Sequence, residues 1–192
     1  MRLYIVRHGK AMDAQPACSS CSCSGKDQSG ETENDFSRGL TGRGQAQARF
    51  LAARLAKDAR PINTIVTSRF PRALQTAHAI QRPLSCDVQT DSRLEVDHEV
   101  AEALEIIHEC ENERELMLVG HNPQLGELIS VLCSGLPPQE LILKTGEMVV
   151  IDIRPTQPIG SGKLVDRARL CDSVQSDDTV IGDVETLIPK AR

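Results

Sequence analysis

Aromatic side chains are scarce in this chain of 192 residues: they make up 2% of it, with three Phe, one Tyr and no Trp. The core must therefore be built from aliphatic side chains. Hydrophobic residues still make up 40% of the sequence, which is enough for one compact α/β domain. We expect a single domain over residues 1–170, followed by a polar, acidic tail over residues 171–192.

Long apolar runs and basic stretches are also missing. No run approaches the length of a membrane span, and Met1-Arg2 precedes only four apolar residues, too few for a signal peptide. The net charge is -5, and no basic stretch of the kind that nucleic-acid binders carry is present. We therefore expect neither a membrane nor a nucleic acid as a partner.

The seven cysteines, an odd number without an export signal, predict reduced thiols in the cytoplasm.

Residues 10–37 form a polar segment with a cysteine cluster at Cys18, Cys21 and Cys23. This C-x-x-C-x-C spacing could hold a metal or a redox centre, because thiolates bind zinc or iron. Zinc would need a fourth ligand, and no second close Cys/His pair supplies one. A solvated, flexible insertion is the favoured interpretation, and we expect no metal and no cofactor.

Three apolar runs end on residues that can do chemistry. They are residues 3–6 before Arg7-His8-Gly9, residues 62–67 before Ser68 and Arg72, and residues 116–119 before Gly120-His121-Asn122-Pro123. Continuous apolar runs are typical of strands buried on both faces. The carboxyl ends of parallel strands meet at one edge of a sheet, where ligands bind. Two arginines and two histidines should therefore converge on one donor-rich pocket.

The intervening segments have helical periodicity. We expect helices over residues 41–57, 99–110 and up to about residue 133, with Thr41 and Asn122 as N-caps. Ser68 should cap a further helix, with Arg72 in its first turn, where guanidinium and free N–H groups form an anion site. Further strands are expected at residues 86–89 and 148–153, with a short edge strand at residues 164–165.

Several known catalytic patterns are absent. The sequence has no paired catalytic carboxylates, P-loop, H-E-x-x-H or G-x-S-x-G motif. What remains at the strand ends is an arginine fork suited to phosphate or carboxylate and a histidine able to act as nucleophile or acid/base. Gly9 should let the backbone turn and leave room for a ligand.

In their order and spacing, four motifs resemble the histidine phosphatase superfamily, which includes phosphoglycerate mutases and acid phosphatases. The matching segments are Arg7-His8-Gly9, Leu40-Thr41-x-x-Gly44-Gln45-Ala46, Ser68…Arg72-Ala73…Gln75-Thr76-Ala77 and Gly120-His121-Asn122-Pro123. The resemblance covers roughly residues 1–165 and is strongest to the SixA branch, the phosphohistidine phosphatases. It implies a three-layer α/β/α sandwich with a mostly parallel central sheet.

The resemblance also implies roles for individual residues. It assigns catalysis to His8, Arg7, Arg72 and His121, and phosphate binding to Arg7, Gly9, Arg38, Arg72, His121 and Asn122. His8 would attack phosphorus and become a phosphohistidine that water hydrolyses, with no metal required. For Arg38 a solvated loop position is an equally good interpretation.

One segment departs from the pattern of the larger relatives, which carry a general acid in a Leu-x-Glu segment. Here the corresponding position falls on Val96, between Glu95 and Asp97. Either neighbour could act as the acid, although alternation along a strand points neighbours to opposite faces. A missing acid suits phosphohistidine, because imidazole can leave already protonated near neutral pH.

The sequence therefore predicts a cytoplasmic, metal-independent phosphohistidine phosphatase that acts on a signalling protein, such as a phosphotransfer-type domain. Two alternatives stay open. The first is a phosphatase of small phosphorylated metabolites, and the second is a non-catalytic module that binds phosphorylated ligands.

Overall fold

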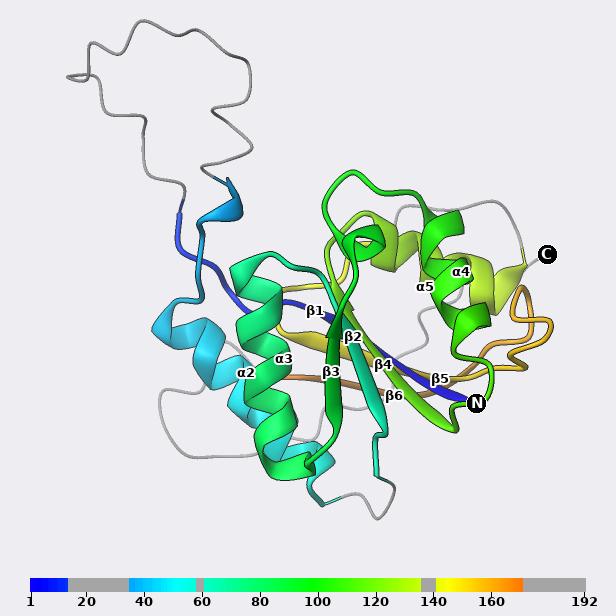
Figure 1. The fold of residues 1–192 in the computed structure, drawn as a ribbon, viewed down its shortest axis with the longest axis horizontal. Coiled ribbons are helices and arrows are strands. Elements are labelled where there is room, and N and C mark those ends of the chain that lie inside the picture. Colours follow the sequence, from blue (N-terminus) through cyan, green and yellow to red (C-terminus); the bar gives the residue numbers. More distant parts are fainter. Residues whose placement is uncertain (14–34, 58–60, 136–140, 171–192) are drawn as a thin grey trace, which may run out of the picture.

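A six-stranded sheet runs through the middle of the molecule (Figure 1). The structure is a computed structural model and describes residues 1–13, 35–57, 61–135 and 141–170. Its strands are β1 Arg2–Arg7, β2 Thr64–Thr67, β3 Asp87–Thr90, β4 Glu115–Gly120, β5 Glu147–Asp152 and β6 Lys163–Arg169. Its helices are α2 Gly42–Leu55, α3 Pro71–Leu84, α4 Val100–Glu109 and α5 Gln124–Ser134, with a short 3-10 helix, η1, at Ser92–Leu94.

The strands lie in the order β3-β2-β4-β1-β5-β6. The first four run parallel to one another, whereas β5 is antiparallel to both of its neighbours. Arg7 pairs with Gly120, and Thr67 pairs with Val119, so β1, β2 and β4 end at the same level. The residues that follow these three strands therefore meet at one edge of the sheet.

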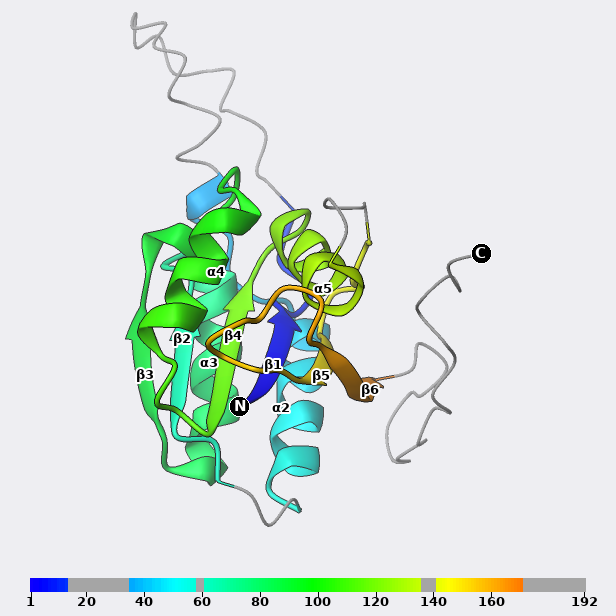
Figure 2. The same ribbon diagram turned by 90° about the vertical axis from the view of Figure 1, so that its right-hand side faces the viewer.

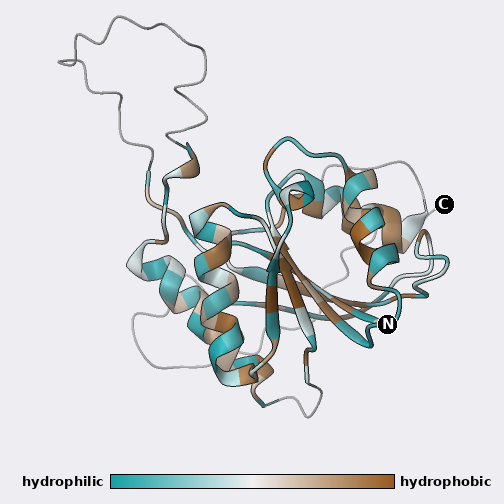
Figure 3. Cartoon of the chain, in the orientation of Figure 1, coloured by the Kyte–Doolittle hydropathy of each residue, from teal (hydrophilic) through white to brown (hydrophobic). Residues whose placement is uncertain are grey.

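Helices cover both faces of the sheet, which confirms the predicted three-layer sandwich (Figure 2). Because successive side chains of a strand point to opposite faces, Leu3 and Ile5 pack towards α4 and α5, and Tyr4 and Val6 towards α2 and α3. Both clusters are built almost entirely from aliphatic side chains, as the scarcity of aromatic residues predicts. Figure 3 shows hydrophobic residues concentrated along the central strands.

The predicted start of the first helix is confirmed in detail. The hydroxyl of Thr41 accepts a hydrogen bond from the Gly44 amide at 3.1 Å and caps α2. The edge strand expected at residues 164–165 is longer than predicted, because β6 is seven residues long and pairs with β5 at six positions. None of the helices in the described ranges is long and apolar enough to span a membrane.

The two ends of the 10–37 segment are tied together beside the start of α2. Ala11 forms an antiparallel bridge with Leu40, and the Met12 amide donates to the Gly39 carbonyl at 2.9 Å. These ends are therefore held in place and not flexible, although most of their described residues are exposed as predicted. The cysteine cluster Cys18, Cys21 and Cys23 and the tail predicted over residues 171–192 lie outside the described residues.

Candidate active site

A cavity of about 380 Å³ opens at the sheet edge where β1 and β4 end. Of the described residues, it is lined by Arg7, His8, Lys10, Ala11, Asp13, Asp35, Arg38, Arg72, Val96, His121, Asn122 and Thr145. The lining includes every residue to which the resemblance assigned catalysis or phosphate binding except Gly9. Four of its side chains are cationic and two are carboxylates, so the cavity suits a small anionic group.

His8 follows β1 directly and is only 8% exposed. Its Nδ1 lies 2.7 Å from the Gly9 carbonyl, which can only accept, so Nδ1 carries the proton and Nε2 keeps its lone pair. Burial is the largest cause that lowers the pKa of His8; the hydrogen bond to the Gly9 carbonyl raises it, the guanidinium groups of Arg72 and Arg7 lower it, and the result is a pKa of about 4. His8 is therefore a neutral imidazole with one ring nitrogen available as a nucleophile.

His121 follows β4 and faces His8, with 4.9 Å between the two ring centroids. Its Nε2 is hydrogen-bonded to the Ser68 hydroxyl at 3.0 Å, which leaves Nδ1 as the ring nitrogen available to a ligand. Burial and the neighbouring His8 lower the pKa of His121 well below its ordinary value. Ser68 was predicted to cap a helix, and this was wrong: α3 begins at Pro71, and its cap, Phe70, makes no side-chain hydrogen bond.

Ser68 has a different role, which is to hold His121. Its hydroxyl accepts a hydrogen bond from the Phe70 amide at 3.2 Å and at the same time contacts His121. A fully buried hydroxyl needs such partners, because an unpaired buried polar group is costly. Ser68 therefore links the end of β2 to the histidine at the end of β4.

Arg7 and Arg72 bring guanidinium groups into the cavity from different elements. Arg7 donates from Nη1 to the Leu143 carbonyl at 2.6 Å, while its buried Nε has no partner among the described residues. Arg72, in the first turn of α3 as predicted, has a side chain only 5% exposed. Burial lowers the pKa of both arginines, but a guanidinium is not deprotonated in proteins, so each keeps its positive charge.

Asp35 joins two of these arginines and was missed by the sequence analysis. One carboxylate oxygen accepts from Arg72 Nη2 at 2.7 Å, and the other accepts from Arg38 Nη1 at 2.6 Å. Arg38 thus lines the cavity from a loop, with its side chain 28% exposed, and its part in phosphate binding stays a prediction. Burial raises the pKa of Asp35, but the two guanidinium groups outweigh it and lower that pKa overall. The only sequence signal for this cluster was that Asp35 lies three residues before Arg38, inside a segment interpreted as an insertion.

Buried polar side chains of the two helices hold the loop after β1. Thr76 accepts from the Gly9 amide at 3.1 Å and donates to the Arg72 carbonyl at 2.7 Å. Gln47 accepts from the Lys10 amide at 2.8 Å and donates to the Thr145 carbonyl at 2.9 Å. Thr76 and Gln47 could have been recognised in the sequence, because each is a polar residue on the apolar face of a predicted helix.

Gly9 is needed for packing, not for ligand space. A Cβ at this position would lie 2.6 Å from the Gly44 carbonyl oxygen, so the loop after β1 crosses the backbone of α2 directly. The expectation that Gly9 leaves room for a ligand is therefore wrong. Its carbonyl contributes by fixing the proton on His8.

Asn122 lines the cavity but does not cap the following helix. Its Nδ2 donates to the Leu143 carbonyl at 2.9 Å, and α5 begins at Gln124 with Pro123 as its cap. Leu143 thus receives hydrogen bonds from both Arg7 and Asn122, which fixes the ends of β1 and β4 against the segment before β5.

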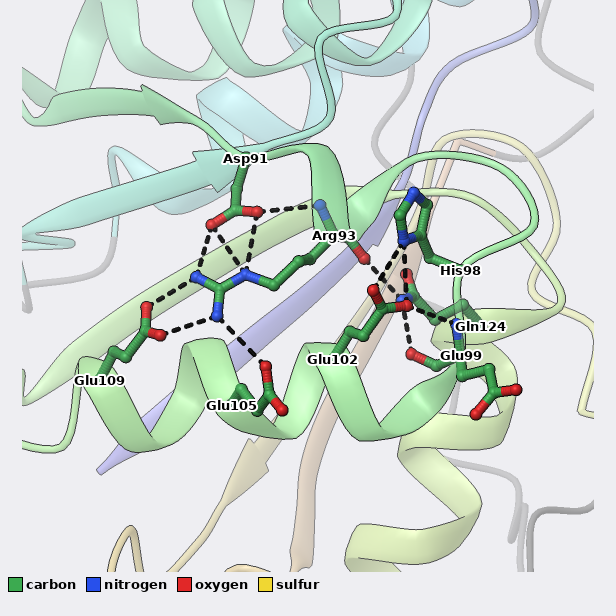
Figure 4. A network of polar contacts seen from close by, with 8 residues as sticks. All are labelled: Asp91, Arg93, His98, Glu99, Glu102, Glu105, Glu109 and Gln124. Atoms are coloured by element: carbon green, nitrogen blue, oxygen red, sulfur yellow. Dashed lines mark hydrogen bonds and ion pairs between the residues drawn. The ribbon is translucent and has the colours of Figure 1, made fainter.

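Val96 lies on the cavity wall, at the position where the larger relatives of the resembled family carry an acid. Among the described residues, neither Glu95 nor Asp97 lines the cavity; Glu95 forms an ion pair with Arg69 instead. The loop that carries Val96 is held at both ends by Gln124, whose Nε2 donates to the carbonyls of Arg93 and Glu99 (Figure 4).

No group of three or more His, Cys, Asp or Glu side chains in the described part of the chain is arranged to hold a metal ion. The cavity instead offers one free imidazole nitrogen on His8 and several guanidinium donors. This combination can bind a phosphoryl group and present a nucleophile to it.

Residues 3–123 match the family model of the histidine phosphatase superfamily, branch 1. The chain belongs to the histidine phosphatase superfamily. No curated protein matches it.

Solved structures of the superfamily share the fold. The protein histidine phosphatase SixA complexed with tungstate is 22% identical, with a TM-score of 0.69 over 88% of this chain and 97% of that one. A protein of Agrobacterium tumefaciens assigned as the phosphohistidine phosphatase SixA is 26% identical, with a TM-score of 0.64 over 87% and 96%. A mycobacterial glucosyl-3-phosphoglycerate phosphatase in complex with VO3 is 18% identical, with a TM-score of 0.61 over 85% and 96%.

Proposed function

We propose that this member of the histidine phosphatase superfamily hydrolyses phosphohistidine on a signalling protein, with His8 as the nucleophile. The observation that carries the proposal is the hydrogen bond from His8 Nδ1 to the Gly9 carbonyl, which leaves Nε2 unprotonated among cationic side chains. The low pKa of His8 keeps this nitrogen free of a proton at neutral pH.

The reaction has two steps. His8 Nε2 attacks phosphorus as the bond from phosphorus to the substrate imidazole breaks, and the imidazole leaves with a proton. Water then attacks the phosphoryl group on His8, releasing inorganic phosphate and regenerating the imidazole. In both steps charge develops on the phosphoryl oxygens, where donors from Arg7, Arg72 and His121 stabilise it.

The leaving-group side of the cavity favours phosphohistidine over an alkyl ester. An alkoxide needs a general acid, and the acid's position is taken by Val96. The two carboxylates that line the cavity do not replace it. Asp35 is held ionised by Arg72 and Arg38, and Asp13 lies exposed at the cavity edge. Imidazole leaves without such help because it can be protonated in solution near neutral pH.

The comparisons support the same substrate class. The relative assigned as a phosphohistidine phosphatase is 26% identical over most of both chains. The alternative is a phosphatase of small phosphorylated metabolites, which the structural likeness to glucosyl-3-phosphoglycerate phosphatase favours. The third possibility, a module that only binds phosphorylated ligands, would leave the free nitrogen of His8 without a use.

The same proposal includes the extent of the catalytic domain, the compartment in which it works and its partner. We infer one catalytic domain over residues 1–170 that works in the cytoplasm without a metal, on a phosphorylated protein and not on nucleic acid or membrane. The described cysteines Cys86, Cys110 and Cys133 are free thiols, which suits a reducing compartment.

The test compares wild type, His8→Ala and the matched control His108→Ala, whose histidine is exposed on α4. Each protein is given a phosphohistidine-bearing phosphotransfer domain and an aryl phosphate ester, with EDTA present. We expect phosphate release from phosphohistidine to exceed release from the ester, to persist in His108→Ala and to vanish in His8→Ala. Faster release from the ester would favour the metabolite alternative, and binding without release would favour the binding module.

A further inference from the structure

Two of the three phenylalanines of this aromatic-poor chain meet beside the cavity. The rings of Phe36 and Phe70 lie 4.9 Å apart, centroid to centroid. The third, Phe50, lies on α2 and packs against the hydrophobic core between that helix and the sheet. Stabilising the core therefore explains Phe50 but leaves the other two unexplained, because Phe36 is 44% exposed and Phe70 only partly buried.

Phe70 contacts two residues of the cavity lining. Its ring lies 5.1 Å from the His121 ring in an edge-to-face arrangement, and the Arg72 guanidinium lies 4.6 Å from its centroid. Both partners are groups that the proposed function places around the phosphoryl group. Neither Phe36 nor Phe70 is among the described residues that line the cavity, so the aromatic pair reaches the phosphate position through its contacts with His121 and Arg72.

The chemistry of the neighbouring wall restricts the leaving group and is compatible with an aromatic substrate. Val96 offers no proton, so a leaving group must depart well without an acid. Imidazole and acidic phenols meet this condition and are rings, whereas the carboxylate of an acyl phosphate meets it without a ring, so Val96 restricts the leaving group and any selection of a ring must come from Phe70. Flat rings are also the groups that gain most from contact with another aromatic ring.

We propose that Phe70 is the specificity-determining residue of this site, and that it selects substrates whose phosphorus is bonded to an aromatic ring. Phe36 extends the surface on the solvent side. The inference rests on the proposed function, in which that ring is the imidazole of phosphohistidine. The inference adds that the site recognises the ring itself and does not depend only on how readily the bond to phosphorus breaks.

The experiment uses four small substrates that separate ring from bond. N-phosphoimidazole and phosphoramidate both contain a phosphorus–nitrogen bond, with and without a ring. p-Nitrophenyl phosphate and acetyl phosphate both contain a phosphorus–oxygen bond, again with and without a ring. The readout is the ratio of kcat/KM for the ring substrate to kcat/KM for its ringless partner.

In Phe70→Leu we expect this ratio to fall about tenfold in both pairs, the upper end of what one aromatic contact contributes. Phe36→Leu should lower it less, because that ring lies outside the contacts to His121 and Arg72. The matched control Phe50→Leu makes the same chemical change away from the cavity and should leave the ratio unchanged. Phe70→Tyr keeps the ring and should retain the wild-type ratio.

Equal loss on all four substrates in Phe70→Leu, at an unchanged melting temperature, would overturn the inference, since Phe70 would then only position Arg72 and His121. The proposed function is read separately, from the preference of wild type for the nitrogen-linked pair over the oxygen-linked pair. Ring selection and bond preference can therefore fail independently.

Discussion

Two arginine–carboxylate clusters in this molecule look alike and are opposite in charge. At the first, the single guanidinium of Arg93 is surrounded by the carboxylates of Asp91, Glu105 and Glu109 (Figure 4). At the second, the single carboxylate of Asp35 lies between the guanidinium groups of Arg38 and Arg72.

The sign of the uncompensated charge separates a structural network from a binding site. Around Arg93 the excess is negative and dispersed, because Glu105 and Glu109 are 64% and 59% exposed and solvent screens them. Around Asp35 the excess is positive, and Arg72 is buried at 5% exposure, where screening is weak. An anion that enters the cavity can neutralise this second excess, whereas the first cluster already satisfies its arginine and holds η1 against α4.

Removing the buried arginine should have the largest effect. We expect Arg72→Ala to lower kcat by about 10²–10³-fold, the scale of one lost transition-state charge donor. Arg72→Lys, which keeps the charge but not the planar fork, should recover only part of the loss. Steady-state kinetics on N-phosphoimidazole measure both. A loss of less than about threefold in Arg72→Ala would mean that this positive charge does not act on the phosphoryl group.

Neutralising the carboxylate should have the opposite sign. In Asp35→Asn the positive excess grows, so the dissociation constant for tungstate should fall about tenfold, or roughly 1.4 kcal/mol in binding free energy. Asp13→Asn is the matched control, because Asp13 also lines the cavity but is exposed, and its effect should be smaller. Isothermal titration calorimetry decides between them. Weaker binding in Asp35→Asn would show that the carboxylate positions the arginines and does not compete with the anion.

The cluster around Arg93 should matter for stability and not for binding. We expect Arg93→Met to lower the free energy of unfolding by about 1 kcal/mol, since its partners are partly exposed, and to leave tungstate affinity unchanged. Urea denaturation and calorimetry on the same protein give both numbers. A tungstate affinity that drops as in Arg72→Ala would erase the distinction between the two clusters.

The last prediction is that His8 does not titrate near neutral pH in the folded protein. The pKa of His8 is about 4, below its ordinary value of 6.5, so the folded protein should keep His8 neutral as the pH falls from 8 to 5. The unfolded chain protonates this histidine below pH 6.5. The free energy of unfolding should therefore decrease between pH 6.5 and 4, by at most about 1.4 kcal/mol per pH unit. NMR of the imidazole nitrogens, assigned with His8→Gln, tests this; titration of His8 near pH 6.5 would contradict it.

The sequence was sufficient to predict the part of the site that lies on the sheet. Arg7, His8 and His121 each follow an abrupt end of an apolar run, and parallel strands must bring such ends together. Arg72 was found because it lies one turn beyond such an end. These positions follow from local patterns, whose geometry is the same in every parallel sheet that has helices on both faces.

What was missed depends on contacts between distant segments. Asp35 reaches Arg72 from a polar segment whose composition says nothing of where its ends lie. Ser68 has the sequence position of a helix cap, yet its hydroxyl is committed to His121, which lies 53 residues away in the chain. Phe36 and Phe70 are likewise brought together by the fold. No periodicity encodes such pairs, because a local pattern fixes which way a side chain faces and not what it meets there.

The most direct test of the central claim is to trap the intermediate on His8. Wild-type protein is mixed rapidly with N-phosphoimidazole, quenched in alkali, in which phosphohistidine survives, and digested for mass spectrometry. We predict one added phosphoryl group on the peptide that contains His8, appearing faster than turnover and absent from His8→Ala. Turnover at the normal rate with no phosphoryl group on His8, or with the group on His121 instead, would contradict the account.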